Sequence, residues 1–474
     1  MLKFGRFIEG KMEESDRGVD VLDPAGGDKI GEVGSSGPEE LERALAFASG
    51  LFPSFASRPV FERARVLELA SDVIEDRAEL FADAIRMEAG KPILLARAEV
   101  NRAVATLRMT ATAARELRGT MREMDGYAQG RGLTAITRRF PVGPVAAISP
   151  FNFPLNLVVH KVAPALAIGC PVVHKPARKT PLSALLLARA LSDAGLAAGA
   201  YQVLVAPPEV AEGLATDDRI ALLTFTGSAE VGWRLRSRSG RKKTVMELGG
   251  NAAVIVEEDA DLDRAARQIA LGSFAYSGQV CISVQRIFAA AGVYDDFKTR
   301  LLAAIEAHVR TGSTTDPAVL VGPMISSGEA DRVMAWVGEA LDGGARAITG
   351  EPKREGNLIH PIVIEGAQGD AKINELEVFG PVATIAPFGS FDEAVELVND
   401  SRYGLQAGVF TRDIGKAMRA FEGLEVGGVI LNDAPTRRVD HMPYGGVKES
   451  GEGREGPVAA LEHMTEERLL LIQK

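Results

Sequence analysis

The sequence is poor in the residues that cross-link small proteins or ligate metals. Of 474 residues only two are cysteine and six are histidine, and the histidines show no metal-ligand spacing. A disulfide framework and a cysteine-rich zinc site are therefore excluded, and we expect no bound metal. No run of 18 apolar residues occurs, because the best candidate, residues 155–173, is interrupted by His160, Lys161 and two prolines. We therefore expect no membrane-spanning helix and no membrane partner.

An excess of positive charge is also absent. Lys plus Arg number 54 and Asp plus Glu number 64, a formal net charge of −10, which argues against nucleic acid as a partner. The first 18 residues lack the apolar stretch of a signal peptide, so we expect a cytoplasmic protein whose cysteines are reduced. Hydrophobic residues at 46% and charged residues at 25% are typical of a folded globular chain.

Glycine, by contrast, is abundant, and the apolar spacing changes along the chain. The 50 glycines are about 11% of the residues against an average near 7%, which indicates tight turns or close approaches of backbone to a ligand. The first quarter has the spacing of amphipathic helices, which we expect after a capping box at residues 36–39 and over residues 61–90 and 94–117. From residue 140, short apolar strands alternate with helices of 10–15 residues, which predicts βαβ units and parallel sheets.

The alternation forms two series, so we predict an α/β fold with two α/β domains that meet near residues 248–251. Residues 119–140 are predicted to form a hairpin outside the helical series. The apolar C-terminal run, residues 469–473, is expected to pair with this hairpin or with another subunit. Strands are predicted at residues 144–148, 171–175, 201–205, 221–225, 252–256 and 286–289, and helices at residues 182–196, 261–277 and 293–309.

Three residues with useful chemistry lie in predicted turns. Cys281 follows Gly278-Gln279 after a helix, where a thiolate nucleophile could stand, although a lone cysteine is more often a small buried hydrophobe, as we expect for Cys170. Glu247 precedes a Gly-Gly turn and is either a surface carboxylate or a general base whose pKa a small cavity raises. Asn152 either caps its own turn or donates a hydrogen bond to an oxyanion.

Two further turns could hold a phosphate-containing ligand. Phe225-Thr226-Gly227-Ser228 joins a predicted strand to a helix, where backbone amides can bind a pyrophosphate, although many tight connections look alike. Lys175 ends another strand and could bond ribose hydroxyls or simply be solvated.

The order of these motifs closely resembles that of the aldehyde dehydrogenase superfamily. The Asn152 loop, the Lys175 turn and FTGS are followed by ELGG at 247–250 and GQVC at 278–281. EVFGP at 377–381 and PYGG at 443–446 complete the series, and the resemblance extends from about residue 15 to the end. It implies two Rossmann-like parallel-sheet domains and a small β oligomerisation element. Residues 1–118 and 142–248 would bind NAD(P), 249–445 would form the catalytic domain, and 119–141 with 456–474 would be the oligomerisation hairpin and arm of a homodimer or homotetramer.

The resemblance also implies the chemistry of the non-acylating, hydrolytic type. Cys281 would attack an aldehyde, Asn152 with the Cys281 N–H would hold the oxyanion, and Lys161 would lie nearby. After hydride transfer to NAD or NADP, Glu247 would activate the water that hydrolyses the thioester to a carboxylic acid. The residues that would contact the cofactor are Ile148, Ser149, Pro150, Phe151, Lys175, Arg178, Phe225, Gly227, Ser228, Val231, Leu248, Gly249, Glu377 and Phe379.

The sequence departs from the family pattern at one informative place. Family members that prefer NAD commonly carry Glu three residues after the lysine, whereas this chain has Arg178. A glutamate there would repel a 2′-phosphate and an arginine would attract one, so we hypothesise that NADP is used.

The range of possible substrates is limited only by cationic and polar residues that the resemblance places in or near the substrate funnel of the family. His160, Arg437, Arg438 and Tyr444 would suit a small anionic aldehyde, such as a semialdehyde or a phospho- or lactaldehyde-like compound. Alternatively, the two arginines are solvated or pair with Asp433 and Asp440. Three rival functions are a CoA-acylating aldehyde dehydrogenase, a thiol hydrolase of esters, and a non-catalytic structural member of the family. The presence of Glu247 favours hydrolysis over acylation of CoA.

Overall fold

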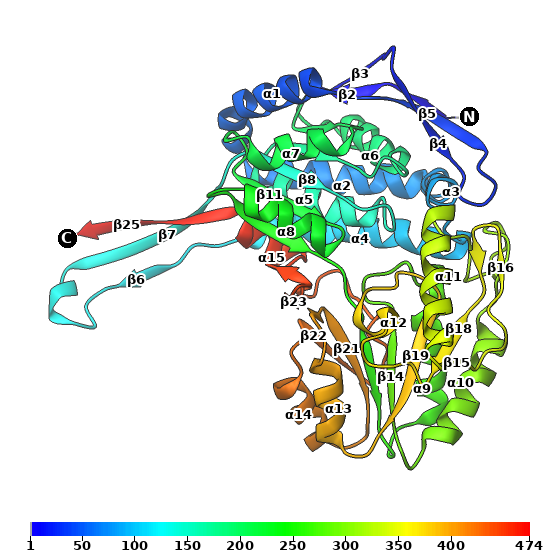
Figure 1. Cartoon of the computed structure of the whole chain (residues 1–474). Coiled ribbons are helices and arrows are strands. Elements are labelled where there is room, and N and C mark those ends of the chain that lie inside the picture. The colour runs from blue at the N-terminus through cyan, green and yellow to red at the C-terminus, as the bar shows by residue number, and fades with distance from the viewer. Residues whose placement is uncertain (1) are drawn as a thin grey trace.

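The computed structural model describes residues 2–474 and has two lobes from which a narrow arm projects (Figure 1). The upper lobe in the figure contains the N-terminus and most of the first half of the chain. The lower lobe contains the segment after about residue 250, and the arm ends at the C-terminus. Each lobe is built on one large sheet.

The first sheet has eight strands, and its centre is parallel, as the sequence predicts. They are β2 (Arg6–Ile8), β3 (Lys11–Glu13), β8 (Val145–Ile148), β9 (Val172–Lys175), β10 (Tyr201–Val203), β11 (Leu222–Thr226), β12 (Lys243–Glu247) and β24 (Gly451–Glu452). Their order is β24-β12-β11-β8-β9-β10-β2-β3, with antiparallel pairs only at the two ends. Ile148 lies beside Lys175, and Thr226 lies beside Glu247. The loops that follow these strands therefore share one edge of the sheet, the usual place for a ligand site in α/β folds.

Helices cover both faces of this sheet because its strands are apolar on both sides. Val145 and Ala147 of β8 face one core, and Ala146 and Ile148 face the other. The helices of this lobe are α1 (Pro38–Ala56), α2 (Val60–Asp76), α3 (Ala78–Ala89), α4 (Ile93–Glu116), α5 (Asn156–Ile168), α6 (Leu182–Asp193), α7 (Pro208–Thr216) and α8 (Ala229–Arg238).

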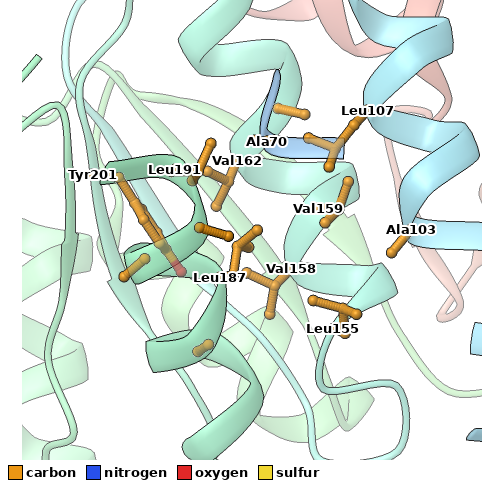
Figure 2. Packing of buried hydrophobic residues seen from close by; sticks show 14 of the residues in the cluster. Ala70, Ala103, Leu107, Leu155, Val158, Val159, Val162, Leu187, Leu191 and Tyr201 are labelled. Atoms are coloured by element: carbon orange, nitrogen blue, oxygen red, sulfur yellow. The ribbon is translucent and has the colours of Figure 1, made fainter. Parts of the chain in front are cut away.

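Helix α5 forms the centre of the larger core. Val158, Val159 and Val162 lie between Leu107 of α4 and Leu187 of α6 (Figure 2). Every residue of α5 is buried, so the polar side chains that this helix carries must find partners inside the protein.

The prediction of one helix over residues 61–90 is wrong. The structure has two helices, α2 and α3, separated at Arg77, whose φ of −110° and ψ of 24° interrupt the helical backbone. The apolar spacing continues across this break, and no glycine or proline marks it. Helix α3 does end at Gly90, which has the left-handed φ of 62° expected at a helix C-terminus.

The second sheet has seven strands and is parallel except for β15 at one edge. They are β13 (Ala253–Val256), β14 (Arg286–Ala290), β15 (Arg346–Ala347), β18 (Ile362–Glu365), β19 (Val382–Phe388), β21 (Gln406–Phe410) and β22 (Gly428–Leu431). Their order is β15-β18-β19-β14-β13-β21-β22. The helices of this lobe are α9 (Leu262–Phe274), α10 (Tyr294–His308), α11 (Ser327–Asp342), α12 (Lys372–Glu375), α13 (Phe391–Asn399) and α14 (Ile414–Gly423).

The segment that leads to Cys281 departs from the predicted helix over residues 261–277. Helix α9 ends at Phe274 and a short 3-10 turn, Ala275–Gly278, follows. Tyr276 and Ser277 have left-handed φ values of 54° and 57°, which are uncommon for residues with a side chain. Such strained backbone persists where the surrounding structure holds it, often near functional sites.

The arm is a three-stranded antiparallel sheet made by β6 (Met121–Glu123), β7 (Leu133–Pro141) and β25 (Thr465–Gln473). The C-terminal strand pairs with the hairpin of its own chain, one of the two predicted partners, with Thr465 opposite Pro141. Residues 456–464 do not extend along the arm, because α15 (Pro457–His463) packs against α4 and α5. The apolar side chains from Leu469 to Ile472 are 40–63% exposed on β25.

The remaining strands form small sheets at the edges of the lobes. They are β1 (Leu2–Phe4), β4 (Gly18–Leu22), β5 (Lys29–Gly34), β16 (Arg354–Glu355), β17 (Leu358–Ile359), β20 (Tyr403–Gly404) and β23 (Val447–Lys448). Across residues 2–474, no helix has both the length and the apolar character that crossing a bilayer requires. The same residues contain no group of three or more His, Cys, Asp or Glu side chains arranged to hold a metal ion.

Candidate active site

A cavity of about 990 Å³ is lined by residues of both lobes. Its walls come from the loops after β8, β11 and β12 and from the segments around Cys281 and Glu377, together with α11. Pockets that bind cofactors and small molecules are typically of this size or smaller. Its lining includes Pro150, Phe151, Asn152, Thr226, Gly227, Ser228, Leu248, Gly249, Cys281, Glu377 and Phe379.

Cys281 places its sulfur at this cavity. The Sγ atom lies 3.0 Å from the hydroxyl oxygen of Tyr444. Burial raises the pKa of the Cys281 thiol to about 11, although the bond to Tyr444 opposes the shift. In the free protein at neutral pH the group is therefore mostly a thiol, and it must lose its proton before it can act as a nucleophile. Cys170 is fully buried in the first lobe and does not reach the cavity, as the sequence predicts.

Glu247 is a buried carboxyl group at the end of β12. Among residues 2–474, neither of its carboxyl oxygens has a hydrogen-bond partner. Burial, and next the charge of Glu455, raise the pKa of Glu247 well above its ordinary value. The surface alternative is therefore wrong: only 3% of Glu247 is exposed. A carboxyl group of raised pKa and free oxygens is suited to proton transfer.

Asn152 follows β8 and its amide is directed towards the Cys281 segment. The Nδ2 atom donates to the carbonyl oxygen of Gln279 at 3.0 Å. An amide nitrogen has two hydrogens, so one remains for a ligand. The side chain is 3% exposed and does not cap its own turn. The structure thus brings Cys281 and Asn152 together from different lobes.

Lys161 lies in a buried network of charges rather than as a free cation. Its Nζ atom donates to Glu455 at 2.9 Å and to the hydroxyl of Thr224 at 3.1 Å. The other carboxyl oxygen of Glu455 accepts from Arg438 at 3.2 Å. Although burial opposes it, the charges of Lys161 and Arg438 lower the pKa of Glu455 to about 2, so this carboxylate is ionised. Its negative charge is one reason why Glu247 favours the protonated form.

Glu377 and Gly249 show why glycine is needed at the cavity. The Oε1 atom of Glu377 accepts from the Gly250 N–H at 3.1 Å, and a Cβ atom on Gly249 would lie 2.2 Å from Oε2. Burial raises the pKa of Glu377 to about 7. Phe379, with a left-handed φ of 48°, packs edge-on against Phe151 with 5.8 Å between ring centroids. The Glu377 carboxyl group, the two phenylalanine rings and the glycine backbone thus form one wall of the cavity.

Other residues predicted to contact the cofactor do not line this cavity. Ile148 and Phe225 are buried in the core beneath it, and Val231 packs against that core. The Ser149 hydroxyl is bonded to His174 Nε2 at 2.8 Å, inside the sheet. Burial, with the charge of Arg178, lowers the pKa of Lys175 to about 8. The exposed Arg178 lines a neighbouring cavity of about 460 Å³.

The four residues predicted near the substrate have different environments. Tyr444 contacts Cys281 as described, and Arg438 stacks on Tyr444 with 3.7 Å from its Cζ atom to the ring centre. His160 is fully buried and bonds Asp440 at 2.9 Å. The Arg437 side chain is 68% exposed and lies 4.0 Å from Asp433.

The alternative in which the arginine pair neutralises Asp433 and Asp440 is therefore wrong for Arg438. Asp440 is bound instead by Arg102, Asn156 and His160. Arg438 pairs with Glu455, and its side chain is 7% exposed. Within the described chain its Nε atom has no hydrogen-bond partner.

Several lining residues were not predicted from the sequence. Thr226 lines the cavity, and its buried hydroxyl has no partner among residues 2–474. Because Thr226 is part of the FTGS motif, the sequence contained a signal that could have indicated this residue. Trp233 follows one helical turn after the motif. Arg332 and Trp336 come from α11, where no local pattern distinguishes them from other surface residues of a helix.

Comparison with known proteins gives the same family as the motif order. The model of the aldehyde dehydrogenase family matches residues 11–470. A curated 3-sulfolactaldehyde dehydrogenase of Priestia aryabhattai is 42% identical over 471 residues, which are 99% of this chain and 98% of that protein.

Two solved structures have closely similar folds. Aldehyde dehydrogenase 21 of Physcomitrella patens, in complex with the reaction product succinate, has a TM-score of 0.97 and 40% identity, covering 99% of this chain and 98% of its own. NADP-dependent glyceraldehyde-3-phosphate dehydrogenase of Bacillus halodurans C-125, complexed with NADP, has a TM-score of 0.96 and 34% identity over the whole of both chains. The Cys281 thiol and the Asn152 amide line one cavity, and Glu247, whose carboxyl group has no hydrogen-bond partner within the described chain, directly precedes Leu248 of the same lining. From this geometry and these comparisons, the chain belongs to the aldehyde dehydrogenase family.

Proposed function

We propose that this protein oxidises a small anionic aldehyde to a carboxylic acid, with NADP⁺ or NAD⁺ as the electron acceptor. The observation that carries the proposal is the meeting of the Cys281 thiol and the Asn152 amide at a cavity large enough for both reactants. Absorbance at 340 nm on mixing the protein with an aldehyde panel and each cofactor tests it. An unchanged absorbance with every pair would contradict it.

Cys281 and Asn152 would share the first step. The Cys281 thiol loses its proton to water, and the thiolate sulfur then attacks the aldehyde carbon, so that the carbonyl oxygen becomes an oxyanion. The second amide hydrogen of Asn152 then stabilises that negative charge in a buried site, where a hydrogen bond to an ion is strong. The nicotinamide cofactor, when bound, would accept the hydride that leaves the substrate carbon, so that a thioester to Cys281 remains.

Glu247 would act in the second step. Its deprotonated form takes a proton from water, and the hydroxide that forms attacks the thioester carbon. The carbon–sulfur bond then breaks, which releases the carboxylic acid and leaves Cys281 as the thiolate. The raised pKa of Glu247 strengthens it as a base, because a carboxylate of higher pKa binds a proton more tightly. Since neither oxygen has a partner within the described chain, no other hydrogen bond must break first.

The residues present fit a nicotinamide dinucleotide. Helix α8 begins at the cavity after Ser228, so its free N–H groups can bind a pyrophosphate. The unpartnered Thr226 hydroxyl lies beside them, and the Glu377 carboxylate can accept from ribose hydroxyls. Phe379 and Phe151 would pack against the nicotinamide.

We propose that Arg178 favours NADP⁺ by attracting its 2′-phosphate. Replacing Arg178 with glutamate should lower the ratio of kcat/KM for NADP⁺ to that for NAD⁺ by at least about tenfold, because a carboxylate repels the phosphate. Initial rates at 340 nm with both cofactors measure the ratio. Arg189→Glu, an exposed position on α6, is the matched control and should leave the ratio unchanged. An unaltered ratio in the Arg178 variant would refute this role.

We propose that the substrate carries a carboxylate, phosphate or sulfonate that Arg438 binds. Arg438 is a buried cation with a free Nε atom beside Tyr444, which contacts the nucleophile. Support comes from the names of the similar proteins, which act on 3-sulfolactaldehyde and glyceraldehyde 3-phosphate.

Replacing Arg438 with methionine should lower kcat/KM for an anionic aldehyde by about ten- to hundredfold, the worth of a hydrogen bond to a charged group. The effect on propionaldehyde should be much smaller. The measured quantity is the ratio of the two, because loss of Arg438 also removes a partner of Glu455. Arg437→Met, at the exposed neighbour, is the control, and an equal loss for both aldehydes would count against anion binding.

We also propose a homodimer or homotetramer in the cytoplasm. The apolar side chains Leu469–Ile472 are exposed on an arm that projects from the lobes (Figure 1), and a second copy would cover them. Sedimentation velocity checks this expectation, and a monomer at micromolar concentration would contradict it.

A further inference from the structure

Lys91 is a buried cation that the reaction described above does not use. It lies in the turn between α3 and α4 and is 1% exposed. Its Nζ atom donates to the Oε2 atom of Glu99, on α4, at 2.5 Å. Burial of a lysine is rare unless its charge is compensated, so the surroundings of this ammonium group indicate what it holds.

Two aromatic rings face the Lys91 ammonium group, and they come from the two loops that carry the reacting groups. The Nζ atom lies 3.6 Å from the ring centre of Phe153 and 4.5 Å from that of Tyr276. Phe153 directly follows Asn152, and Tyr276 precedes Cys281 by five residues. The two rings also pack edge-on against each other at 6.4 Å. A cation between two ring faces attracts both, and burial strengthens that attraction.

Hydrogen bonds tie the same two loops to the Lys91 turn. The Oε1 atom of Glu99 accepts from the backbone N–H groups of Leu155 and Asn156 at 2.9 and 3.1 Å, where the Asn152 loop enters α5. The Tyr276 hydroxyl donates to the carbonyl of Ala89 at 2.9 Å, two residues before Lys91. The Asn152 loop is therefore bound to Glu99, and the loop that leads to Cys281 is bound next to Lys91, the other member of the same ion pair.

The loops meet again at the reacting groups themselves. Asn152 donates to the carbonyl of Gln279, two residues before Cys281. The left-handed backbone at Tyr276 and Ser277 turns the chain towards that contact, and the Tyr276 ring is held at the Lys91 ammonium. A shift of either ring would change the distance between the oxyanion donor and the sulfur.

We propose that Lys91 is a positioning residue: its ammonium group, paired with Glu99 and facing Phe153 and Tyr276, holds the Asn152 amide in place relative to the Cys281 sulfur. The inference rests on the proposed function. Lys91 would act through Asn152, so loss of Lys91 should lower the rate only while Asn152 is present. Misplacement of a reacting group by about 1 Å can cost about a hundredfold in rate, so even a small relaxation of the two loops would be measurable.

A double-mutant cycle tests this role. The paired variant Lys91→Met with Glu99→Gln removes both charges together, so that no single buried charge is left unpaired, and the glutamine oxygen can still accept from Leu155 and Asn156. We expect kcat/KM for the aldehyde to fall by at least about tenfold in the wild-type background. In an Asn152→Ala background the same pair of changes should cost less than about twofold, because the donor that is positioned has already gone.

Two further measurements separate positioning from general stability. Lys298→Met removes another cation that packs on an aromatic ring, 4.8 Å from the centre of Tyr294 and remote from the cavity, and should leave kcat/KM unchanged. If the paired variant does not fold, Phe153→Leu replaces it in the same cycle. Equal losses in the two backgrounds would overturn the proposal, as would a paired variant that is as active as wild type.

Hydrolysis of p-nitrophenyl acetate distinguishes failure of this inference from failure of the proposed function. That reaction needs the thiol and the oxyanion donor but no cofactor. A wild-type protein that hydrolyses the ester yet reduces no cofactor contradicts the dehydrogenase proposal. The role of Lys91 is then tested by the same double-mutant cycle with the rate of ester hydrolysis, in which the paired variant should lose less activity in the Asn152→Ala background than in the wild type. Additive losses in ester hydrolysis would overturn the role of Lys91 alone.

Discussion

Replacing Cys281 with alanine should reduce aldehyde-dependent formation of NADPH or NADH by at least about ten-thousandfold, because loss of a catalytic nucleophile removes the covalent route entirely. Alanine fills most of the space of the side chain, so the fold should persist. The measurement is absorbance at 340 nm with saturating aldehyde, together with circular dichroism to check the fold.

The second cysteine provides the matched control. Cys170 is fully buried, and burial raises the pKa of its thiol to about 12, so it should not react. Cys170→Ala should retain nearly all activity, since a small buried side chain is replaced by a slightly smaller one. If Cys281→Ala kept a substantial rate, or Cys170→Ala lost it, the assignment of the nucleophile would be wrong.

The pKa of Cys281 adds a pH dependence to the same prediction. Because burial raises it to about 11 in the free protein, the thiolate fraction should grow about tenfold per pH unit across the neutral range. Alkylation of Cys281 by iodoacetamide, followed by mass spectrometry, should accelerate accordingly. An alkylation rate that does not change with pH above pH 7 would contradict the prediction, because it would mean that Cys281 is already a thiolate at neutral pH.

Replacing Glu247 with glutamine should slow steady-state turnover by about a hundredfold to ten-thousandfold, the range for loss of a general base. The first turnover should be much less affected, because the proposed role of Glu247 begins only after the thioester has formed. Stopped-flow absorbance at 340 nm should therefore show a burst of about one reduced cofactor per site followed by a slow phase. Mass spectrometry should find the acyl group on Cys281.

The control for this variant is another buried glutamate. Glu257 is 3% exposed and pairs with Lys416, and it directly follows β13 in the second sheet, whereas Glu247 ends β12 in the first. Glu257→Gln should leave both phases unchanged. Equal slowing of the burst and the slow phase in Glu247→Gln would show that the carboxylate acts before the thioester, which contradicts its assignment to water.

Glu247 also determines the expected effect of pH on hydrolysis. Its pKa lies well above 4.5, and only the deprotonated form accepts a proton from water. The slow phase of the wild type should therefore increase as pH rises towards and through that raised pKa, and it should be lost as pH falls. Glu247→Gln should remove this dependence.

Much of the fold could be predicted from the sequence because the signals are local. Apolar runs bounded by glycine and proline predict β8 and β9, and the structure places strands there. The break at Arg77 has no such signal, because the apolar spacing of α2 runs on into α3. The end of α9 before the 3-10 turn is equally hidden, since Tyr276 and Ser277 are held in their conformation by residues remote in sequence.

The candidate site divides in a similar way. The order of motifs predicts Cys281, Glu247 and Asn152, and these predictions rest on residue type and spacing. The partner of Arg438 could not be predicted, because the nearby acidic residues in the sequence are Asp433 and Asp440, whereas the ion pair is with Glu455 on a segment that returns to the first lobe. No local pattern singles out Lys91, whose partners come from α4 and from both loops at the cavity.

By itself, the sequence determined which chemical groups this protein has and the alternation of strands and helices that carries them. Residue type sets nucleophilicity, basicity and the ability to donate, and periodicity sets local structure. Only the tertiary structure decided how those groups behave. Burial raises the pKa of Cys281 and of Glu247, and Glu247 has no hydrogen-bond partner within residues 2–474. Solvation and the distances between charges depend on segments that are far apart in the chain and meet only when both lobes have folded.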